Sequence, residues 1–388
     1  MNSLFKGIIS LIKSGIDGTK INLPSDFCWE KTIEILKEHK LVMLAYYGVY
    51  NSGIELPENI NSFFKQFVFQ AAIYEEKQNH EIENILKAFS KNKIDHLPLK
   101  GCVLKKVYPK SEMRPMSDAD ILITKEQKAL ADKVMAELGF RLDEETHHEI
   151  IYIKDNVFIE LHKSLIPDYN KDYYSYYGDG WKFANRKDEY SYEFSPEDMF
   201  IFLLTHFAKH YRDGGISILH MVDLWVYMRE YSLDENYMKE ELEKLNLYKF
   251  YSNICETVNC WFIEGKSTEM SDFFAEKMFN NKRWGSEESR FISDTIKYSN
   301  ESSSKNIKLK RIINVIFPSV EYMKFRYPVL QKHKWCLPLT WISRWFETIF
   351  KKRKNIKEIS INLKNTDFEE VKRYKNELEY VGLEYKFY

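Results

Sequence analysis

The sequence predicts an α+β fold, in which a small β-sheet core lies between helical segments on its N-terminal and C-terminal sides. Two patterns predict it. Apolar residues recur at the helical spacing of three and four over most of the chain, whereas short β-branched runs gather between about residues 91 and 165. The chain has 388 residues, 44% of them hydrophobic, so it is long enough to bury a sizeable core and more than one packing unit.

The first 90 residues are predicted to form an N-terminal helical segment. The run FFKQFVFQAAIY leads into EEKQNHEIENILKAF, and Phe67, Ala71, Ile82 and Ile85 recur at helical intervals through it. The period then changes, and residues 91–165 are predicted to form the sheet core.

The core begins with a short extended stretch, HLPLK, followed by a short helix over CVLKKVY and a strand that includes ILIT. A second helix, KEQKALADKVMAELGF, places Leu130, Val134 and Leu138 on one face and ends at Gly139. The sequences EIIYIK and VFIELH, joined by Asp-Asn, predict a hairpin.

Residues 166–355 are predicted to be mainly helical, and 356–388 to form a small β-α-β appendix. A helix is expected to start at SPEDMF, with Ser195 as its N-cap, Pro196 in the first turn and Asp198 at the capping-box position. In the tail, EISINL and GLEYKFY predict strands and TDFEEVKRYKNELEYV predicts a helix.

Charge and cysteine content indicate a protein of the cytoplasm. Lys and Arg number 57 against 58 Asp and Glu, a net charge of -1, so no overall field attracts nucleic acid or an anionic membrane. The five cysteines include no C-x-x-C pair, which indicates a reducing compartment. No run approaches the roughly 18 apolar residues that span a bilayer, and the N-terminus lacks a secretory h-region, so we expect a soluble protein.

Paired carboxylates stand where a buried strand begins, in RPMSDADILI. Because side chains two apart on a strand share a face, Asp118 and Asp120 project together. If the second hairpin strand pairs beside this one, Glu160 joins them as a third acid. Hard oxygen ligands suit Mg²⁺ or Mn²⁺, which keep coordination positions open for substrate phosphates, so phosphate chemistry is the leading hypothesis.

These motifs resemble a known family. LPLKG, a short helix, RPMSDADILI, a helix ending in LGF and a hairpin ending in IELH are similar to the putative nucleotidyltransferases of the polymerase-beta superfamily, most clearly from about His96 to Leu165. A weaker resemblance continues through LLTHFAKH, HMVDL, FPSVEYMKFRYP and CLPLTWISRW. The resemblance implies a minimal nucleotidyltransferase fold with a mixed β-sheet, in which a glycine turn holds an NTP and three carboxylates hold two divalent ions.

Matched motif by motif, the resemblance implies that the catalytic and metal-binding acids are Asp118, Asp120 and Glu160. It places the nucleotide and phosphate contacts at Lys100, Gly101, Cys102, Arg114, Ser117 and His162. The superfamily usually has Gly-Ser or Gly-Gly at the turn, whereas this chain has Gly101-Cys102 and a longer spacing to Asp118. Metal binding is therefore better supported by the sequence than triphosphate binding.

Each assignment has a structural alternative. Lys100 and Arg114 would equally neutralise the acids as ion pairs, and Gly101 would serve an ordinary strand-to-helix turn. His206 and His210 have a zinc-like spacing but no third ligand, so we expect them to line a core; His147 and His148 would reach phosphate or stay as surface residues.

Two further stretches have both a ligand-binding and a packing interpretation, and we expect packing against the protein core in each case. The tyrosine-rich insert DYNKDYYSYYGDGWKF would stack a base or pack a loop, and we expect packing. WISRWFETIFKKRKN is expected to be a half-buried helix with a solvated basic end.

Three functions compete on sequence alone. The first is an active transferase that modifies a hydroxyl on a small molecule or protein. The others are a degenerate core that only binds nucleotide or protein, and an RNA-directed terminal transferase. The complete acid triplet favours activity, and the near-zero net charge favours an acceptor other than nucleic acid.

Overall fold

The computed structural model describes residues 2–168, 170–280, 329–351 and 368–384, together with a few positions between 313 and 327. Its contacts divide the chain into two compact units. The first comprises Met1–Ala208 and Ile216–Arg283, and the second comprises Lys209–Gly215 and Trp284–Tyr388. All the residues that the sequence assigns to the site lie in the first unit.

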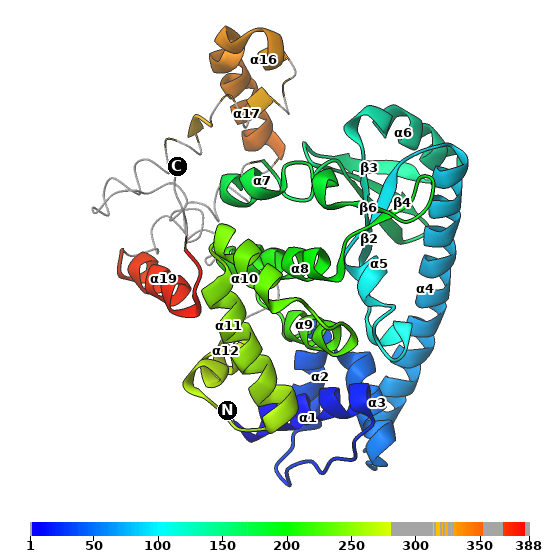
Figure 1. Ribbon diagram of the computed structural model, residues 1–388, viewed down its shortest axis with the longest axis vertical. Helices are drawn as coiled ribbons and strands as arrows, with labels where there is room; N and C mark the ends of the chain where they lie inside the picture. The colour runs from blue at the N-terminus through cyan, green and yellow to red at the C-terminus, as the bar shows by residue number, and fades with distance from the viewer. Residues whose placement is uncertain are drawn as a thin grey trace. The chain divides into compact units, whose positions relative to one another are not determined.

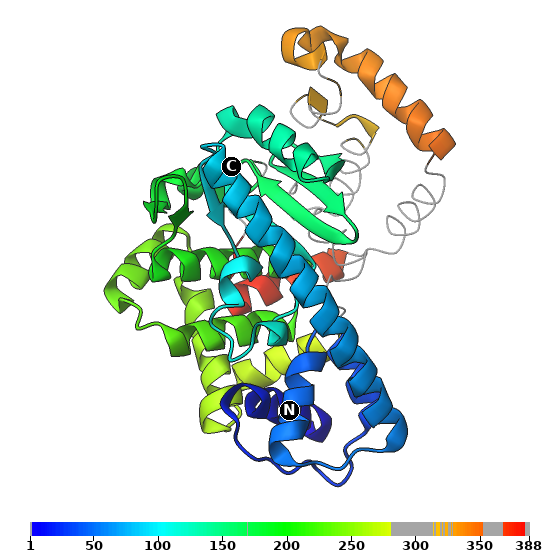
Figure 2. The ribbon, with the colours of Figure 1, turned by 90° about the vertical axis from the view of Figure 1, so that its right-hand side faces the viewer.

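The N-terminal segment is helical, as predicted. Its helices are α1 (Ser3–Asp17), α2 (Trp29–Glu38), α3 (Val42–Ser52) and α4 (Glu58–Lys91). Helices α1 and α3 pack closely because each presents a glycine. A Cβ on Gly15 would lie 2.2 Å from the carbonyl oxygen of Leu44, and one on Gly48 would lie 2.1 Å from that of Leu11. The long helix α4 continues from these helices along the sheet (Figures 1 and 2).

Five strands form a mixed sheet in the spatial order β1-β2-β5-β4-β3, which confirms the predicted α+β class. They are β1 (His96–Pro98), β2 (Asp118–Ile123), β3 (Arg141–Glu145), β4 (Glu149–Lys154) and β5 (Val157–His162). Strands β2 and β5 are parallel, and the other neighbouring pairs are antiparallel. Between the strands lie α5 (Gly101–Leu104) and α6 (Lys128–Glu137).

The predicted hairpin is β4 and β5. Its turn residues Asp155 and Asn156 have φ of 47° and 70°, which is the left-handed pair that a two-residue type I′ turn requires and that Asp and Asn tolerate. The turn fixes the register, and the register determines which residues of β5 face the same way as the acids of β2.

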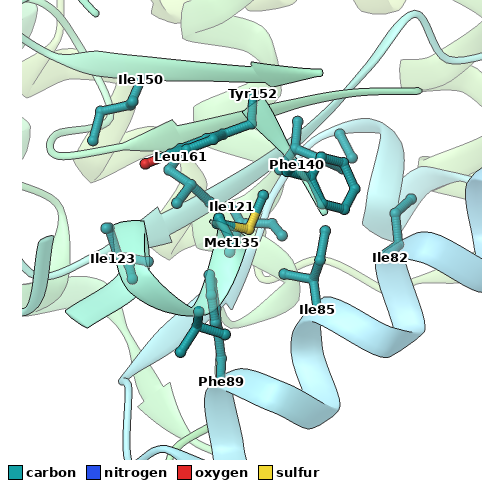
Figure 3. Packing of buried hydrophobic residues seen from close by; sticks show 14 of the residues in the cluster. Ile82, Ile85, Phe89, Ile121, Ile123, Met135, Phe140, Ile150, Tyr152 and Leu161 are labelled. Carbon is teal, nitrogen blue, oxygen red and sulfur yellow. The ribbon is translucent and has the colours of Figure 1, made fainter. Parts of the chain in front are cut away.

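One face of the sheet is covered by α4 and α6 (Figure 3). The apolar side chains of this core come from alternate positions along each strand: Ala119, Ile121 and Ile123 come from β2, and Val157, Ile159 and Leu161 from β5. They pack on Ile82, Ile85 and Phe89 of α4 and on Ala131, Val134 and Met135 of α6. The opposite face of β2 and β5 therefore carries the acids.

Two details of the core differ from the sequence analysis. Leu130 was expected on the buried face of α6, but it is 38% exposed, because Ala131, Val134 and Met135 form that face. Strand β3 was not predicted, since its residues RLDEE are mostly exposed and show no apolar alternation; it is an edge strand held by β4. As expected, Gly139 ends α6 with φ of 84°.

The remainder of the first unit is mainly helical. It contains α7 (Lys171–Tyr177), α9 (Ile218–Glu230), α10 (Glu235–Lys244), α11 (Tyr248–Val258) and α12 (Glu269–Asn280), with a short ladder of β6 (Asn185–Arg186) and β7 (Tyr192–Glu193). Helix α8 (Pro196–Arg212) starts as predicted: the Ser195 hydroxyl accepts from the Asp198 amide and donates to its carboxylate.

Toward the C-terminus, the described residues include the helices α16 (Val329–Lys332), α17 (Leu337–Lys351) and α19 (Phe368–Val381). Helix α19 confirms the helix predicted for the tail, whereas the strand predicted at 358–363 and most of the one at 382–388 lie outside the described residues. The four-part division of the chain at residues 90, 165 and 355 stays a prediction. None of the helices in the described residues is long and apolar enough to cross a bilayer.

Candidate active site

The parallel pairing of β2 with β5 brings the three predicted acids together. Asp120 lies directly opposite Glu160, and Leu122 lies opposite His162. Asp118 is two residues before Asp120 and so shares its face. The sequence predicted a shared site only if the second hairpin strand, β5, pairs beside the strand of the two aspartates, β2, and the structure shows this pairing.

Asp120 is the centre of this cluster. It is buried, and its Oδ1 accepts a hydrogen bond from Lys100 Nζ at 2.6 Å and another from His162 Nε2 at 2.7 Å. His162 Nε2 also lies 3.5 Å from Glu160 Oε2. Lys100 therefore forms the ion pair that the sequence analysis gave as one of its two roles. His162 contacts two of the acids directly.

The electrostatics of the cluster show an excess of negative charge. Burial raises the pKa of Asp118 above its ordinary value, and the charges of Asp120 and Glu160 raise it further. Burial acts in the same direction on Asp120, but Lys100 and His162 outweigh it and hold the pKa of that carboxyl below its usual range. One lysine is thus not enough to neutralise three adjacent acids.

The residues fit a divalent cation. Single donor atoms of Asp120, Glu160 and His162 all lie within 4.8 Å of one another, a spacing compatible with one ion between them. The raised pKa of Asp118, caused by burial and then by the neighbouring carboxylates, is the perturbation that a cation between these groups would relieve. Which of these residues hold an ion stays a prediction.

The turn that delivers Lys100 is strained. Lys100 has φ of 42° and ψ of −113°, a conformation that costs a non-glycine residue about 1–3 kcal/mol. The Leu99 amide donates to the Asp120 carbonyl at 2.9 Å, which ties the turn to β2 at the central acid. Strain of this kind persists where the surroundings fix the backbone, and here it aims the Lys100 ammonium at Asp120.

Gly101 is needed for packing. A Cβ at this position would lie 2.4 Å from Met116 Sδ, so the residue two before Asp118 packs directly on the Gly101 backbone. The amides of Cys102 and Val103 already donate to the carbonyls of Leu99 and Lys100. This geometry supports the ordinary-turn alternative, while triphosphate contact at Gly101 stays a prediction.

Cys102 and Ser117 flank this turn. Cys102 is buried, and burial raises the pKa of its thiol to about 12. The Ser117 hydroxyl accepts a hydrogen bond from Lys40 Nζ, and the Ser117 carbonyl accepts one from the Tyr74 hydroxyl at 3.3 Å. Lys40 and Tyr74 carry no motif and lie far from the site along the chain, so no signal in the sequence predicts them there.

Arg114 is held in a buried ion pair with Asp223. Its Nε donates to Asp223 Oδ1 at 2.7 Å and its Nη2 to Asp223 Oδ2 at 2.9 Å, while Nη1 donates to the Pro115 carbonyl. The Tyr108 hydroxyl donates to Asp223 Oδ1 at 2.6 Å. The ion pair expected of Arg114 is therefore made with Asp223 of α9, in the HMVDL stretch. Contact of Arg114 with phosphate stays a prediction.

The other ligand candidates divide between surface and core. His147 pairs with Asp168 at 3.4 Å, and His148 with Glu149 at 3.0 Å. In the tyrosine-rich insert, Tyr177 is buried and its hydroxyl hydrogen-bonds with Thr205 at 2.9 Å, so this side chain packs the insert onto the core as expected. Among the described residues, His206 and His210 belong to no group of three that would hold a metal.

The part of the chain that contains the sheet matches a known protein family. A family model described as "Uncharacterised nucleotidyltransferase" matches residues 25–263. The chain belongs to this family of nucleotidyltransferases. The match covers the N-terminal helices from α2, the whole sheet and the helices to the end of α11, so it contains every predicted site residue.

None of the curated proteins compared with the chain matches it. A solved structure of the antibiotic-resistance factor ANT(2'')-Ia is similar to this chain with a TM-score of 0.34 and 13% sequence identity, over 47% of this chain and 95% of that chain.

Proposed function

We propose that this protein transfers a nucleoside monophosphate from an NTP to a hydroxyl group of a small-molecule or protein acceptor, with release of pyrophosphate and with dependence on Mg²⁺ or Mn²⁺. The observation that carries the proposal is the β2 and β5 register, which pairs Asp120 with Glu160 and leaves Asp118 on the same face. It does so within a chain of a nucleotidyltransferase family.

In this proposal the acids act as a unit. Asp118, Asp120 and Glu160 would hold the cation. A bound divalent ion would activate the acceptor hydroxyl and neutralise the charge that develops on the leaving pyrophosphate. Glu160 is the least buried of Asp120, Glu160 and His162, with a side chain 19% exposed, so it is the group best placed to take the proton of the acceptor hydroxyl.

The positive groups would act on the triphosphate. Lys100 keeps its charge, because burial alone would lower its pKa but the charges of Asp120 and Glu160 raise it above the ordinary value. A buried, charged ammonium beside the acids is suited to pair with a phosphate oxygen once a cation takes its place on Asp120. Lys40, at the Ser117 hydroxyl, is a second candidate for this role.

We also propose a cytoplasmic setting. Each of the five cysteines, at positions 28, 102, 255, 260 and 336, has a free thiol, which is the state expected in a reducing compartment. The balance of 57 basic and 58 acidic residues favours a small-molecule or protein acceptor over nucleic acid.

The test is labelling of an acceptor. The protein is incubated with each α-labelled NTP, Mg²⁺ and cell extract, and the labelled product is identified. We expect one NTP to label a small molecule or protein. Asp120→Asn should abolish labelling, and the matched control Asp155→Asn, at the exposed hairpin tip, should keep it. Equal labelling by wild type and Asp120→Asn, or no labelling with any NTP, would contradict the proposal.

A further inference from the structure

His162 contacts the acids through one ring nitrogen. It is the last residue of β5, two after Glu160, so the strand projects it on the same face as the acids. Nε2 lies 2.7 Å from Asp120 Oδ1 and 3.5 Å from Glu160 Oε2. The side chain is only 5% exposed, and so it is held in place rather than sampling solvent.

The other ring nitrogen is unconstrained. His162 Nδ1 is buried and has no hydrogen-bond partner among the residues that the structure describes. Asp120 Oδ1 accepts a hydrogen bond from Nε2, and no protein group there competes for a proton at Nδ1. The ring is thus able to carry its proton on Nδ1 and present the Nε2 lone pair to an ion between the two carboxylates.

We propose that His162 Nε2 is a metal ligand, and that Asp120, Glu160 and His162 bind one divalent ion as a mixed nitrogen and oxygen set. The inference builds on the proposed function, since it names the ion that the site takes. In the described structure Nε2 hydrogen-bonds to Asp120 Oδ1 at 2.7 Å, and an ion would take the place of that hydrogen bond. Asp118 then remains to share a second ion.

The ligand set has a consequence for metal choice. Mg²⁺ prefers an all-oxygen shell in octahedral geometry, whereas imidazole nitrogen strengthens binding of transition ions such as Mn²⁺. An imidazole in the set therefore predicts that this site binds Mn²⁺ more tightly than Mg²⁺. An all-carboxylate site formed by Asp118, Asp120 and Glu160 would show a smaller preference.

The experiment uses Mn²⁺ as probe, with and without a non-hydrolysable NTP analogue. Electron spin-echo modulation of bound Mn²⁺ detects a directly coordinated ¹⁴N nucleus, and titration gives the dissociation constants of Mn²⁺ and Mg²⁺. The variant is His162→Gln, which keeps an N–H donor for Asp120 but removes the imidazole. The matched control is His148→Gln, whose ring centre lies 6.4 Å from that of His162 and whose Nε2 pairs with Glu149.

We expect ¹⁴N modulation in wild type and in His148→Gln, and none in His162→Gln. We also expect His162→Gln to weaken Mn²⁺ binding by at least roughly tenfold, with a smaller effect on Mg²⁺. Tight Mn²⁺ binding without ¹⁴N modulation in wild type, or equal loss of both ions in His162→Gln, would show that His162 only positions Asp120 and would overturn this inference alone. Absence of any ion binding in wild type, with or without the analogue, would overturn the metal-dependent function as well.

Discussion

Removal of the Asp223 carboxylate should destabilise the first unit strongly. Asp223→Ala takes away the acceptor of three hydrogen bonds, at 2.6, 2.7 and 2.9 Å, from Tyr108 and Arg114. The Arg114 and Asp223 side chains are only 14% and 6% exposed, so water does not replace the lost partner. Leaving one charge of a buried ion pair uncompensated costs about 3–5 kcal/mol. The expected fall in Tm is at least roughly 6 °C.

The assay is thermal and guanidinium unfolding of the full chain. Glu230→Ala, at the exposed end of α9, is the matched control and should change the free energy of unfolding by less than about 0.5 kcal/mol. The apolar double variant Arg114→Met/Asp223→Leu should recover much of the loss, because no charge is left buried. A cost below about 1 kcal/mol for Asp223→Ala would refute the reasoning, and so would a double variant no more stable than Asp223→Ala.

Three further outcomes follow from single contacts. Gly101→Ala should lower the free energy of unfolding by about 1–3 kcal/mol, since its Cβ would lie 2.4 Å from Met116 Sδ. Adding Met116→Ala should relieve this clash, and an unchanged unfolding midpoint for Gly101→Ala alone would contradict the close packing. Lys100→Met should tighten Mg²⁺ binding on the order of tenfold, because it removes the ammonium that competes with the ion for Asp120, and it should raise the KM for NTP, because it removes the proposed phosphate contact. Calorimetry that finds weaker Mg²⁺ binding in this variant would count against the competition. Burial raises the pKa of the Cys255 thiol from 9.0 to about 11, so at pH 8 it holds roughly a hundredfold less thiolate than an ordinary cysteine. Iodoacetamide should therefore alkylate Cys255 that much more slowly than it alkylates N-acetylcysteine, with the rate still rising at pH 10; mass spectrometry showing equal rates, or a plateau near pH 9, would exclude the shift.

The sheet core and its acid face could be predicted because their signals are local. Alternation along β2 separates Asp118 and Asp120 from Ala119 and Ile121 within four residues. The Asp155 turn sets the hairpin register without reference to distant parts of the chain. Only the pairing of β5 with β2 had to be assumed, and the parallel register confirms it.

The partners of the site residues could not be predicted in the same way. Arg114 and Asp223 are 109 residues apart, and nothing in either local sequence indicates the other. Gly101 is selected by the packing of Met116, a contact that a strand-turn-helix pattern does not reveal. The strand pattern predicts that His162 shares a face with Glu160, but it does not predict that Nε2 lies 2.7 Å from Asp120 Oδ1; phosphate contact at His162 stays a prediction.

The most direct test of the central claim is the rate of pyrophosphate release with the identified NTP, acceptor and Mg²⁺. The account predicts that Asp118→Asn, Asp120→Asn and Glu160→Gln each lower this rate by at least roughly a hundredfold, with circular dichroism and Tm near wild type. Wild-type turnover in any of the three variants would show that the carboxylates brought together by β2 and β5 do not act as one catalytic site.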